Sequence, residues 1–83
     1  MKFKALVYVT LKDGYSDPEG ETTAYALKGL GYSVNDVRSS KAYEVLFEAA
    51  DRAKAEKVLE EMCRRLLTNP TKDDYHFEIS ELR

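Results

Sequence analysis

The chain has 83 residues, of which 13 are Lys or Arg and 15 are Asp or Glu, so its net charge is −2. This balance argues against nucleic acid as a partner, because such binding depends on basic side chains that neutralise phosphates. No apolar run approaches the ~20 residues that a membrane-spanning helix requires, and the lone Cys63 allows no internal disulfide. We therefore expect residues 1–83 to form one small domain in the reducing cytoplasm, with no nucleic-acid or membrane partner.

The first part of the sequence predicts a strand followed by a helix. Residues 2–11 place apolar side chains at every second position, which is the period of a strand with one buried face. In the stretch SDPEG, residues 16–20, Asp17 suits the N-cap position and Pro18 suits the first helical position. Apolar residues then recur at helical spacing until Gly31, which is typical of a helix end.

The remainder predicts two short strands, a second helix and a final strand. Within residues 33–48, the segments SVNDVRSS and AYEVLF predict strands joined by a turn near residues 39–41. An amphipathic helix follows from Asp51 and ends at Asn69-Pro70, since the residue before a proline disfavours helical dihedral angles. The segment DYHFEIS then alternates as a strand does.

The predicted order β-α-β-β-α-β indicates an α+β fold of the ferredoxin-like kind. In this two-layer sandwich, two helices cover one face of a four-stranded antiparallel sheet. The other face has no helix to cover it, and it carries apolar residues that would form a patch. A contiguous apolar patch usually marks an interface, so we expect this face to pack against a second copy of the chain. The dimer-face candidates are Leu6, Tyr8, Ala42 and Leu46.

The sequence contains no recognisable set of reactive groups. His76 and Cys63 are the only residues of their kinds, and no paired spacing such as CxxC or HxxxH occurs. No nucleophile–base pair is apparent, and adjacent acidic residues do not face one another on a helix or strand. The glycines around SDPEG lie near a helix start, but Glu21 stands where a phosphate-binding loop needs lysine. We therefore expect no catalytic, cofactor-binding or metal-binding residue in this chain.

Four stretches taken together resemble the PurS family, the small subunits of the multi-chain phosphoribosylformylglycinamidine (FGAM) synthase of bacteria and archaea. They are VYVTLKDGYSDPEG, ALKGLGY, DVRSSKAYEV and EKVLEEMCRRLLTNPTKDDYHFEI, and they span nearly the whole chain in matching order and spacing. The sequence departs from the family at Ser40, where many members have glycine. Thr71 and Lys72 also replace a pair that is usually apolar in the family.

The resemblance implies the non-catalytic subunit of an ATP-dependent carbon–nitrogen ligase in de novo purine biosynthesis. In that complex a glutaminase subunit releases ammonia from glutamine. A large subunit, expected to hold ATP and magnesium, uses the ammonia to convert formylglycinamide ribonucleotide to its amidine. The small subunit is implied to be a homodimer or higher oligomer that bridges the other two and assists ammonia transfer. The residues alone leave a second hypothesis open, a stand-alone regulatory module of ferredoxin-like topology that binds a small ligand.

Two interpretations remain open for the residues that match the family's motifs. Asp17, Pro18 and Gly20 either start a helix and allow a close backbone approach, or face a partner subunit. Arg38 and Lys41 either meet acidic groups of a partner or guard an exposed strand edge. The full set of candidate partner contacts is Asp17, Pro18, Gly20, Arg38, Lys41, Asn69, Pro70 and Tyr75.

Overall fold

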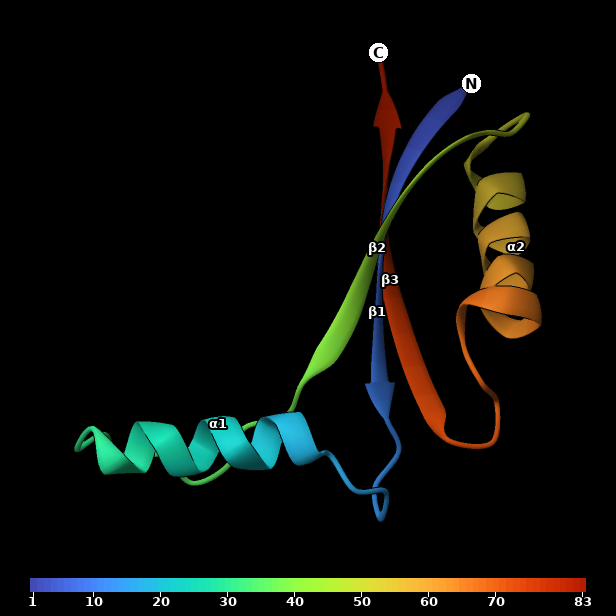
Figure 1. The fold of residues 1–83 in the computed structure, drawn as a ribbon. Coiled ribbons are helices and arrows are strands. Elements are labelled where there is room, and N and C mark those ends of the chain that lie inside the picture. Colours follow the sequence, from blue (N-terminus) through green and yellow to red (C-terminus); the bar gives the residue numbers. More distant parts are fainter.

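The structure, a computed structural model, describes all 83 residues as three strands and two helices (Figure 1). In chain order these are β1 (Lys2–Leu11), α1 (Pro18–Gly29), β2 (Ser40–Glu48), α2 (Arg52–Met62) and β3 (Asp73–Leu82). A single π-helical turn (Cys63–Leu67) extends α2 before the chain turns into β3. The α+β class is as predicted, but the observed order is β-α-β-α-β.

The sheet is antiparallel, with β1 in the middle and β2 and β3 at its two edges. Both edge strands pair with β1 in an unbroken register, in which Ala5 lies between Val45 of β2 and Ile79 of β3. Because residues on one face alternate with residues on the other, this register places all three side chains on the same face. That face is the one that α2 covers.

The core lies between α2 and this face of the sheet. Phe3, Ala5 and Val7 of β1 are fully buried, and so are Leu59 and Cys63 on the helical side. Apolar side chains of the edge strands pack around them: Tyr43, Val45, Phe47, Tyr75, Phe77 and Ile79. The core is small, since only 11 of the 83 residues are buried.

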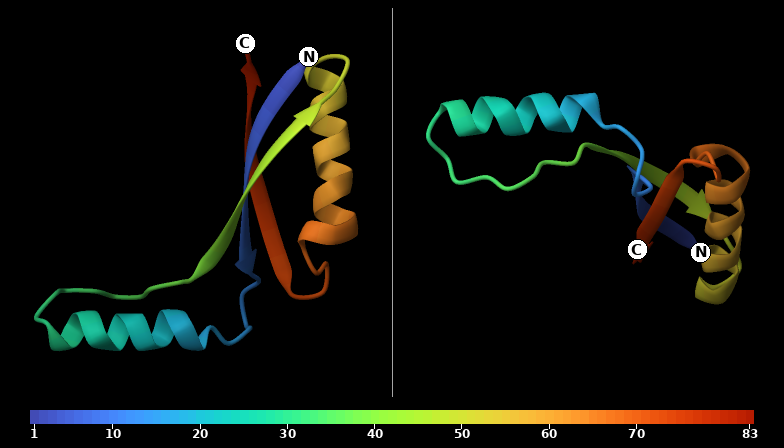
Figure 2. Two further views of the ribbon diagram at one scale, coloured as in Figure 1. Left: turned by 45° about the horizontal axis from the view of Figure 1, so that its top comes forward. Right: turned by 90° about the horizontal axis from the view of Figure 1, so that it is seen from below.

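The predicted four-stranded sheet is wrong, because residues 33–39 form no strand. This segment runs back along α1 and away from the sheet, so no strand lies beside it for pairing (Figure 2). Backbone N–H groups of this segment donate to side chains instead of to a neighbouring strand. The N–H of Val37, for example, donates to the Asp36 carboxylate at 2.9 Å. The turn predicted near residues 39–41 is wrong too, since Ser40 already begins β2.

The prediction that both helices cover one face is also wrong. Only α2 lies on the sheet, whereas α1 projects from one end of the sheet on the side opposite to α2 (Figures 1 and 2). The buried part of α1 is limited to Gly20 and Ala24, while Tyr25 and the C-cap residue Leu30 are exposed. A helix with so narrow an apolar stripe gains little from packing on a sheet.

The ends of α1 nevertheless agree with the sequence. Asp17 caps the helix with its side chain, and Pro18 is the first helical residue. At the other end Gly31 has φ 94°, a conformation that glycine adopts without a steric penalty. The N–H of Tyr32 donates to the carbonyl of Leu27 at 3.2 Å, which closes the final turn.

The projecting helix makes the molecule extended. Its radius of gyration is 16.3 Å, whereas a compact domain of this length would have about 12 Å. The two chain termini lie close together at the end of the sheet that is far from α1 (Figure 1).

Leucine-to-alanine substitutions on α2 and the turn that follows it test where the core lies. Leu59 is fully buried, so Leu59→Ala should lower the free energy of unfolding by about 2–5 kcal/mol. Leu66 is 84% exposed, so Leu66→Ala should change the free energy of unfolding by less than about 0.5 kcal/mol. Urea unfolding followed by circular dichroism measures both values. Equal effects of the two substitutions would contradict this description of the core.

Candidate functional site

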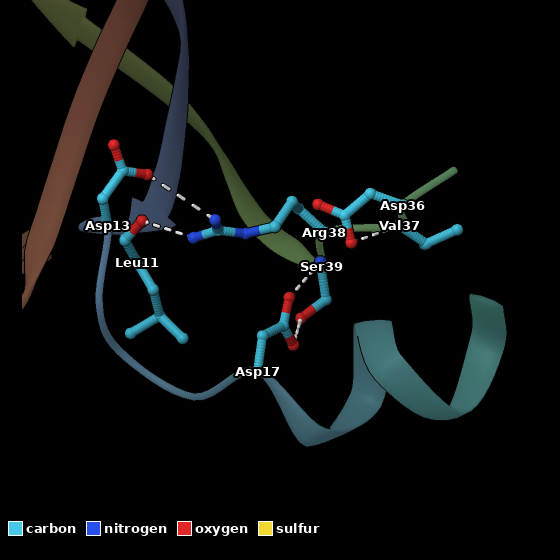
Figure 3. Close-up of polar contacts among 7 residues, drawn as sticks. All are labelled: Leu11, Asp13, Asp17, Asp36, Val37, Arg38 and Ser39. Atoms are coloured by element: carbon cyan, nitrogen blue, oxygen red, sulfur yellow. Dashed lines mark hydrogen bonds and ion pairs between the residues drawn. The ribbon is translucent and has the colours of Figure 1, made fainter. Parts of the chain in front are cut away.

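A cluster around Asp17 fastens α1 to the segment that leads into β2. The Asp17 carboxylate accepts a hydrogen bond from the N–H of Gly20 at 3.0 Å. It also accepts hydrogen bonds from the N–H and the hydroxyl of Ser39, both at 2.6 Å (Figure 3). Only 6% of Asp17 is exposed. We call Asp17, Gly20, Val37 and Ser39 the clasp, because they join two segments about twenty residues apart in the sequence.

The clasp favours the charged form of Asp17. The hydrogen bond from the Ser39 hydroxyl is the main cause that holds the pKa of Asp17 below its ordinary value of 3.8, followed by the backbone N–H groups of Gly20 and Ser39. The nearby Arg38 guanidinium contributes in the same direction, while burial opposes it. Asp17 is therefore ionised at neutral pH, and its carboxylate joins the start of α1 to Ser39.

Gly20 allows the two segments of the clasp to touch. A Cβ atom at this position would overlap the carbonyl oxygen of Val37 and crowd the Asp17 carboxylate. The requirement is steric contact, since Gly20 does not have a positive φ. The close backbone approach predicted for Gly20 is thus confirmed, and the segment against which it packs is residues 37–39.

Arg38 ties the same segment to the end of β1. Its Nη2 donates to the carbonyl oxygen of Leu11 at 2.9 Å, and its Nη1 lies 3.7 Å from a carboxylate oxygen of Asp13 (Figure 3). Because the Asp13 side chain is fully exposed, the ion pair adds little stability. The bond to the Leu11 carbonyl is the contact that positions Arg38.

The remaining candidate contacts gather at the same end of the sheet as the clasp. At this end β1 finishes and β2 and β3 begin, and Leu11 pairs with Asp73. Lys41, Asn69 and Pro70 are exposed there. We call this region, residues 11–20, 38–41 and 68–75, the sheet end. A cavity of about 250 Å³ opens in it, and its lining includes Ser39, Lys41 and Lys72.

Tyr75, another candidate contact, turns its phenol group inward. Its hydroxyl donates to the Glu60 carboxylate of α2, and this bond, aided by burial, raises the pKa of Tyr75 to about 12. Burial likewise raises the pKa of the nearby Cys63 thiol, which makes it a poor nucleophile. The structure holds no group of three or more His, Cys, Asp or Glu residues that could bind a metal ion. None of its helices is long and apolar enough to cross a membrane.

All four dimer-face candidates lie on the face opposite to α2. We call this surface the open face. Tyr8 stands at its centre, paired with Ala42 on one side and with His76 on the other, where the two rings stack with centroids 4.8 Å apart. Leu6 lies next to Tyr8 on the same face of β1, and Leu46 is 65% exposed. The four residues therefore share one face, where the charged residues Lys4, Glu44 and Glu78 lie among them.

Sequence reasoning missed Ser39, which supplies two of the three hydrogen bonds to Asp17. Serines are common in loops, and a spacing of 22 residues from Asp17 carries no periodic signal. Only the fold brings the two together.

An open sheet face and a projecting helix are features of small modules that associate with other chains. Comparisons with known proteins give the particular family. The family model described as "PurS: Phosphoribosylformylglycinamidine (FGAM) synthase" matches residues 4–81. The chain therefore belongs to the PurS family, whose members are subunits of FGAM synthase in purine biosynthesis.

Relatives and solved structures agree with this assignment. The PurS subunit of Methanocaldococcus jannaschii is 36% identical over 96% of this chain and 98% of its own length. That of Archaeoglobus fulgidus is 44% identical over 83% of this chain and 88% of its own length. The Thermus thermophilus PurS structure superposes with a TM-score of 0.91 at 34% identity over the full length of both chains. A chain of the PurLQS structure from Thermotoga maritima superposes with a TM-score of 0.89 at 28% identity, over 96% of this chain and 99% of that chain.

Two glycine substitutions in α1 test the clasp. Gly20→Ala inserts a methyl group against the Val37 carbonyl and should lower stability by about 1–3 kcal/mol. This corresponds to about 4–8 °C in Tm for each kcal/mol. Gly29→Ala meets no atom within 4 Å and should leave Tm unchanged or raise it, because alanine favours helix. Thermal unfolding measures both. A Gly20→Ala variant as stable as wild type would show that the close contact does not matter.

The lowered pKa of Asp17 predicts how its contribution depends on pH. Because the folded-state pKa lies below 3.8, the carboxylate stabilises the fold above that pH and loses this effect as pH falls through the folded-state value. Asp17→Asn should therefore have a lower Tm than wild type at pH 7. The difference should shrink below pH 3.8.

Asp13→Asn is the matched control for Asp17→Asn, since its exposed carboxylate makes only the pair with Arg38. It should unfold close to the wild-type temperature across the whole pH range. A Tm difference for Asp17→Asn that stays constant from pH 7 to pH 2.5 would rule out the carboxylate as the source of the effect.

Proposed function

We propose that this chain is the adaptor of FGAM synthase. It bridges a glutaminase subunit and a large ATP-dependent subunit and assists the passage of ammonia between them. The observation that carries the proposal is its likeness over nearly the whole chain to a component of the T. maritima structure named PurLQS, an assembly of three kinds of subunit. Two side chains that could take part in catalysis are both engaged within the fold: Cys63 is buried, and the Tyr75 hydroxyl is hydrogen-bonded to Glu60. This supports a role that does not depend on catalytic residues of this chain. ATP and magnesium then belong to the large subunit, and the complex works in the cytoplasm.

The sheet end is the surface that we assign to the other subunits. It collects Pro18, Lys41, Asn69 and Pro70 from separate parts of the chain, and these residues are exposed. The clasp and Arg38 join two of the contributing segments, residues 11–20 and 38–41, by hydrogen bonds. Asp17, Gly20 and Tyr75 then act indirectly, by positioning this surface.

The chain also associates with a second copy of itself. The open face and the exposed apolar side chains of α1 support this, because both leave apolar surface in water. Only 11 residues are buried within one chain, so a second copy would add substantially to the core.

The adaptor role is tested with the large and glutaminase subunits, assayed with and without this chain. Amidine formation is measured with glutamine as the nitrogen donor and, in parallel, with ammonia. The glutamine-driven rate should fall at least tenfold without the chain, whereas the ammonia-driven rate should fall much less. Equal rates with and without the chain in both assays would overturn the proposal and favour the ligand-binding module.

Charge reversal at two exposed lysines tests the assigned surface. Lys41→Glu alters the sheet end and should weaken the glutamine-driven reaction, whereas Lys54→Glu on α2 should not. Both variants should keep the wild-type Tm, since neither side chain makes an ion pair within the chain. Equal losses for the two lysines would place the contact surface elsewhere.

A further inference from the structure

Leu66 lies in solvent although its position in the sequence belongs to the buried face of α2. It follows Leu59 by about two turns of an α-helix, so a regular helix would direct both side chains toward the core. In the structure Leu59 is fully buried, whereas Leu66 is 84% exposed. Of the large apolar side chains in the chain, Leu66 is the most exposed.

The π-helical turn Cys63–Leu67 accounts for this exposure. Its hydrogen bond runs from the N–H of Thr68 to the carbonyl of Cys63 at 3.0 Å, which is one residue longer than the α-helical pattern. The wider turn changes which residue faces the sheet. Leu67 packs against the core, in the place that Leu66 would take in a regular helix.

Thr68 holds the turn in this form. Its hydroxyl donates to the same Cys63 carbonyl at 2.8 Å, and Thr68 is only 9% exposed. Single exposed leucines are common on protein surfaces, but this one is kept there by an irregular turn that is itself hydrogen-bonded in place. Turns of the π type occur frequently at functional sites. The exposed Leu66 adds little to the stability of the chain, which points to a use outside it.

The turn adjoins the sheet end. A cavity of about 300 Å³ lies between the two, and its lining includes Arg64 of the turn and Pro70 and Tyr75 of the sheet end. In Figure 1 the turn is the orange end of α2, which lies toward the same end of the sheet as those loops. Leu66 therefore continues the surface that we assign to the other synthase subunits.

The turn also carries two arginines that lack a carboxylate partner. Arg64 and Arg65 are exposed, and neither forms an ion pair within the chain. Arg64 donates only to a backbone carbonyl of α2, and Arg65 makes no side-chain hydrogen bond. Three acidic residues lie nearby, Glu61 one turn earlier and Asp73 and Asp74 in the cavity lining, but none pairs with either guanidinium. Both arginines can therefore meet carboxylates of another chain, and arginine is enriched at protein interfaces.

We propose that Leu66 and Arg65 form a docking point for an acidic segment of another synthase subunit. An apolar side chain of that segment covers Leu66, and a neighbouring carboxylate pairs with Arg65. The proposal rests on the adaptor role proposed above and names a contact through which that role is carried out.

A second copy of the chain is a poorer occupant of this docking point. A two-fold contact brings the same patch of both chains together. Centred on the turn, it would place the arginines of one copy against those of the other, and opposed like charges disfavour association. An acidic segment meets no such repulsion.

The two parts of the docking point contribute in different ways. Removing Leu66 and its apolar partner from water supplies affinity. The arginines attract the acidic segment over a longer range and fix its orientation. Salt should weaken the second contribution more than the first, because it screens exposed charges.

Leu66→Ala in the assembled synthase tests the apolar part. The chain is titrated into the large and glutaminase subunits, and the glutamine-driven rate gives the concentration needed for half of the maximal rate. Leu66→Ala should raise this concentration at least tenfold and leave the maximal rate unchanged, because the side chain contributes to binding only. The control is Leu82→Ala, which truncates an exposed leucine of β3 at the far end of the sheet and should behave as wild type.

The outcomes separate the docking point from the adaptor role. Equal half-maximal concentrations for Leu66→Ala and wild type would overturn the docking point and leave the adaptor role standing. A wild-type chain without effect on the glutamine-driven rate would overturn both. Weaker self-association of Leu66→Ala in sedimentation velocity would assign Leu66 to a contact between copies and would likewise overturn the proposal.

Charge reversal at Arg65 tests the carboxylate partner. Arg65→Glu should raise the half-maximal concentration at least tenfold at low salt, and its difference from wild type should narrow as salt is added. Lys57→Glu, the matched reversal at an exposed position of α2, should stay close to wild type. Equal losses for the two reversals, or a loss for Arg65→Glu that does not vary with salt, would contradict the proposal.

Discussion

The position of α1 depends on one carboxylate. Asp17 satisfies the free N–H groups at the start of the helix and at the same time holds Ser39, just before β2. Without these bonds little would hold α1 in place, since only Gly20 and Ala24 of the helix are buried. A charged acceptor suits this task, because hydrogen bonds to ionised groups are about twice as strong as neutral ones. The clasp thus does for α1 what a hydrophobic interface does for α2.

Placing an anionic anchor at this point has a consequence for the rest of the fold. The segment from Ser33 to Ser39 is drawn along α1 and cannot pair with the sheet, so the sheet ends with β2 as an edge strand. The helix itself is held away from the open face. The three-stranded sheet, the uncovered face and the extended shape are therefore connected features, and all three follow from where the Asp17–Ser39 contact directs the chain.

The sequence predicted the local features of the fold correctly and the long-range ones only in part. The alternation in β1, the cap at Asp17 and the stop at Gly31 depend on neighbouring residues, and the structure has all three. Whether residues 33–39 become a strand depends on a partner strand that local pattern cannot supply. Ser39 was missed for the same reason, since its role exists only when the fold brings Asp17 beside it. The candidate contacts were found one by one, but their meeting at the sheet end was visible only in three dimensions.

The physical properties of the chain fit a subunit whose contribution is shape. Its polar groups with shifted pKa values, Asp17, Cys63 and Tyr75, are each engaged within the fold, and each fixes or fills a position. What the chain offers to solvent is an uncovered sheet face, exposed apolar side chains on and just after α1, and a sheet end whose loops are joined by hydrogen bonds. The sheet end overlaps two of the regular elements, since Pro18–Gly20 belong to α1 and Ser40–Lys41 belong to β2. A protein bound at the sheet end would therefore contact the starts of α1 and β2 directly, and the hydrogen bonds of Asp17 determine how these two starts lie relative to each other.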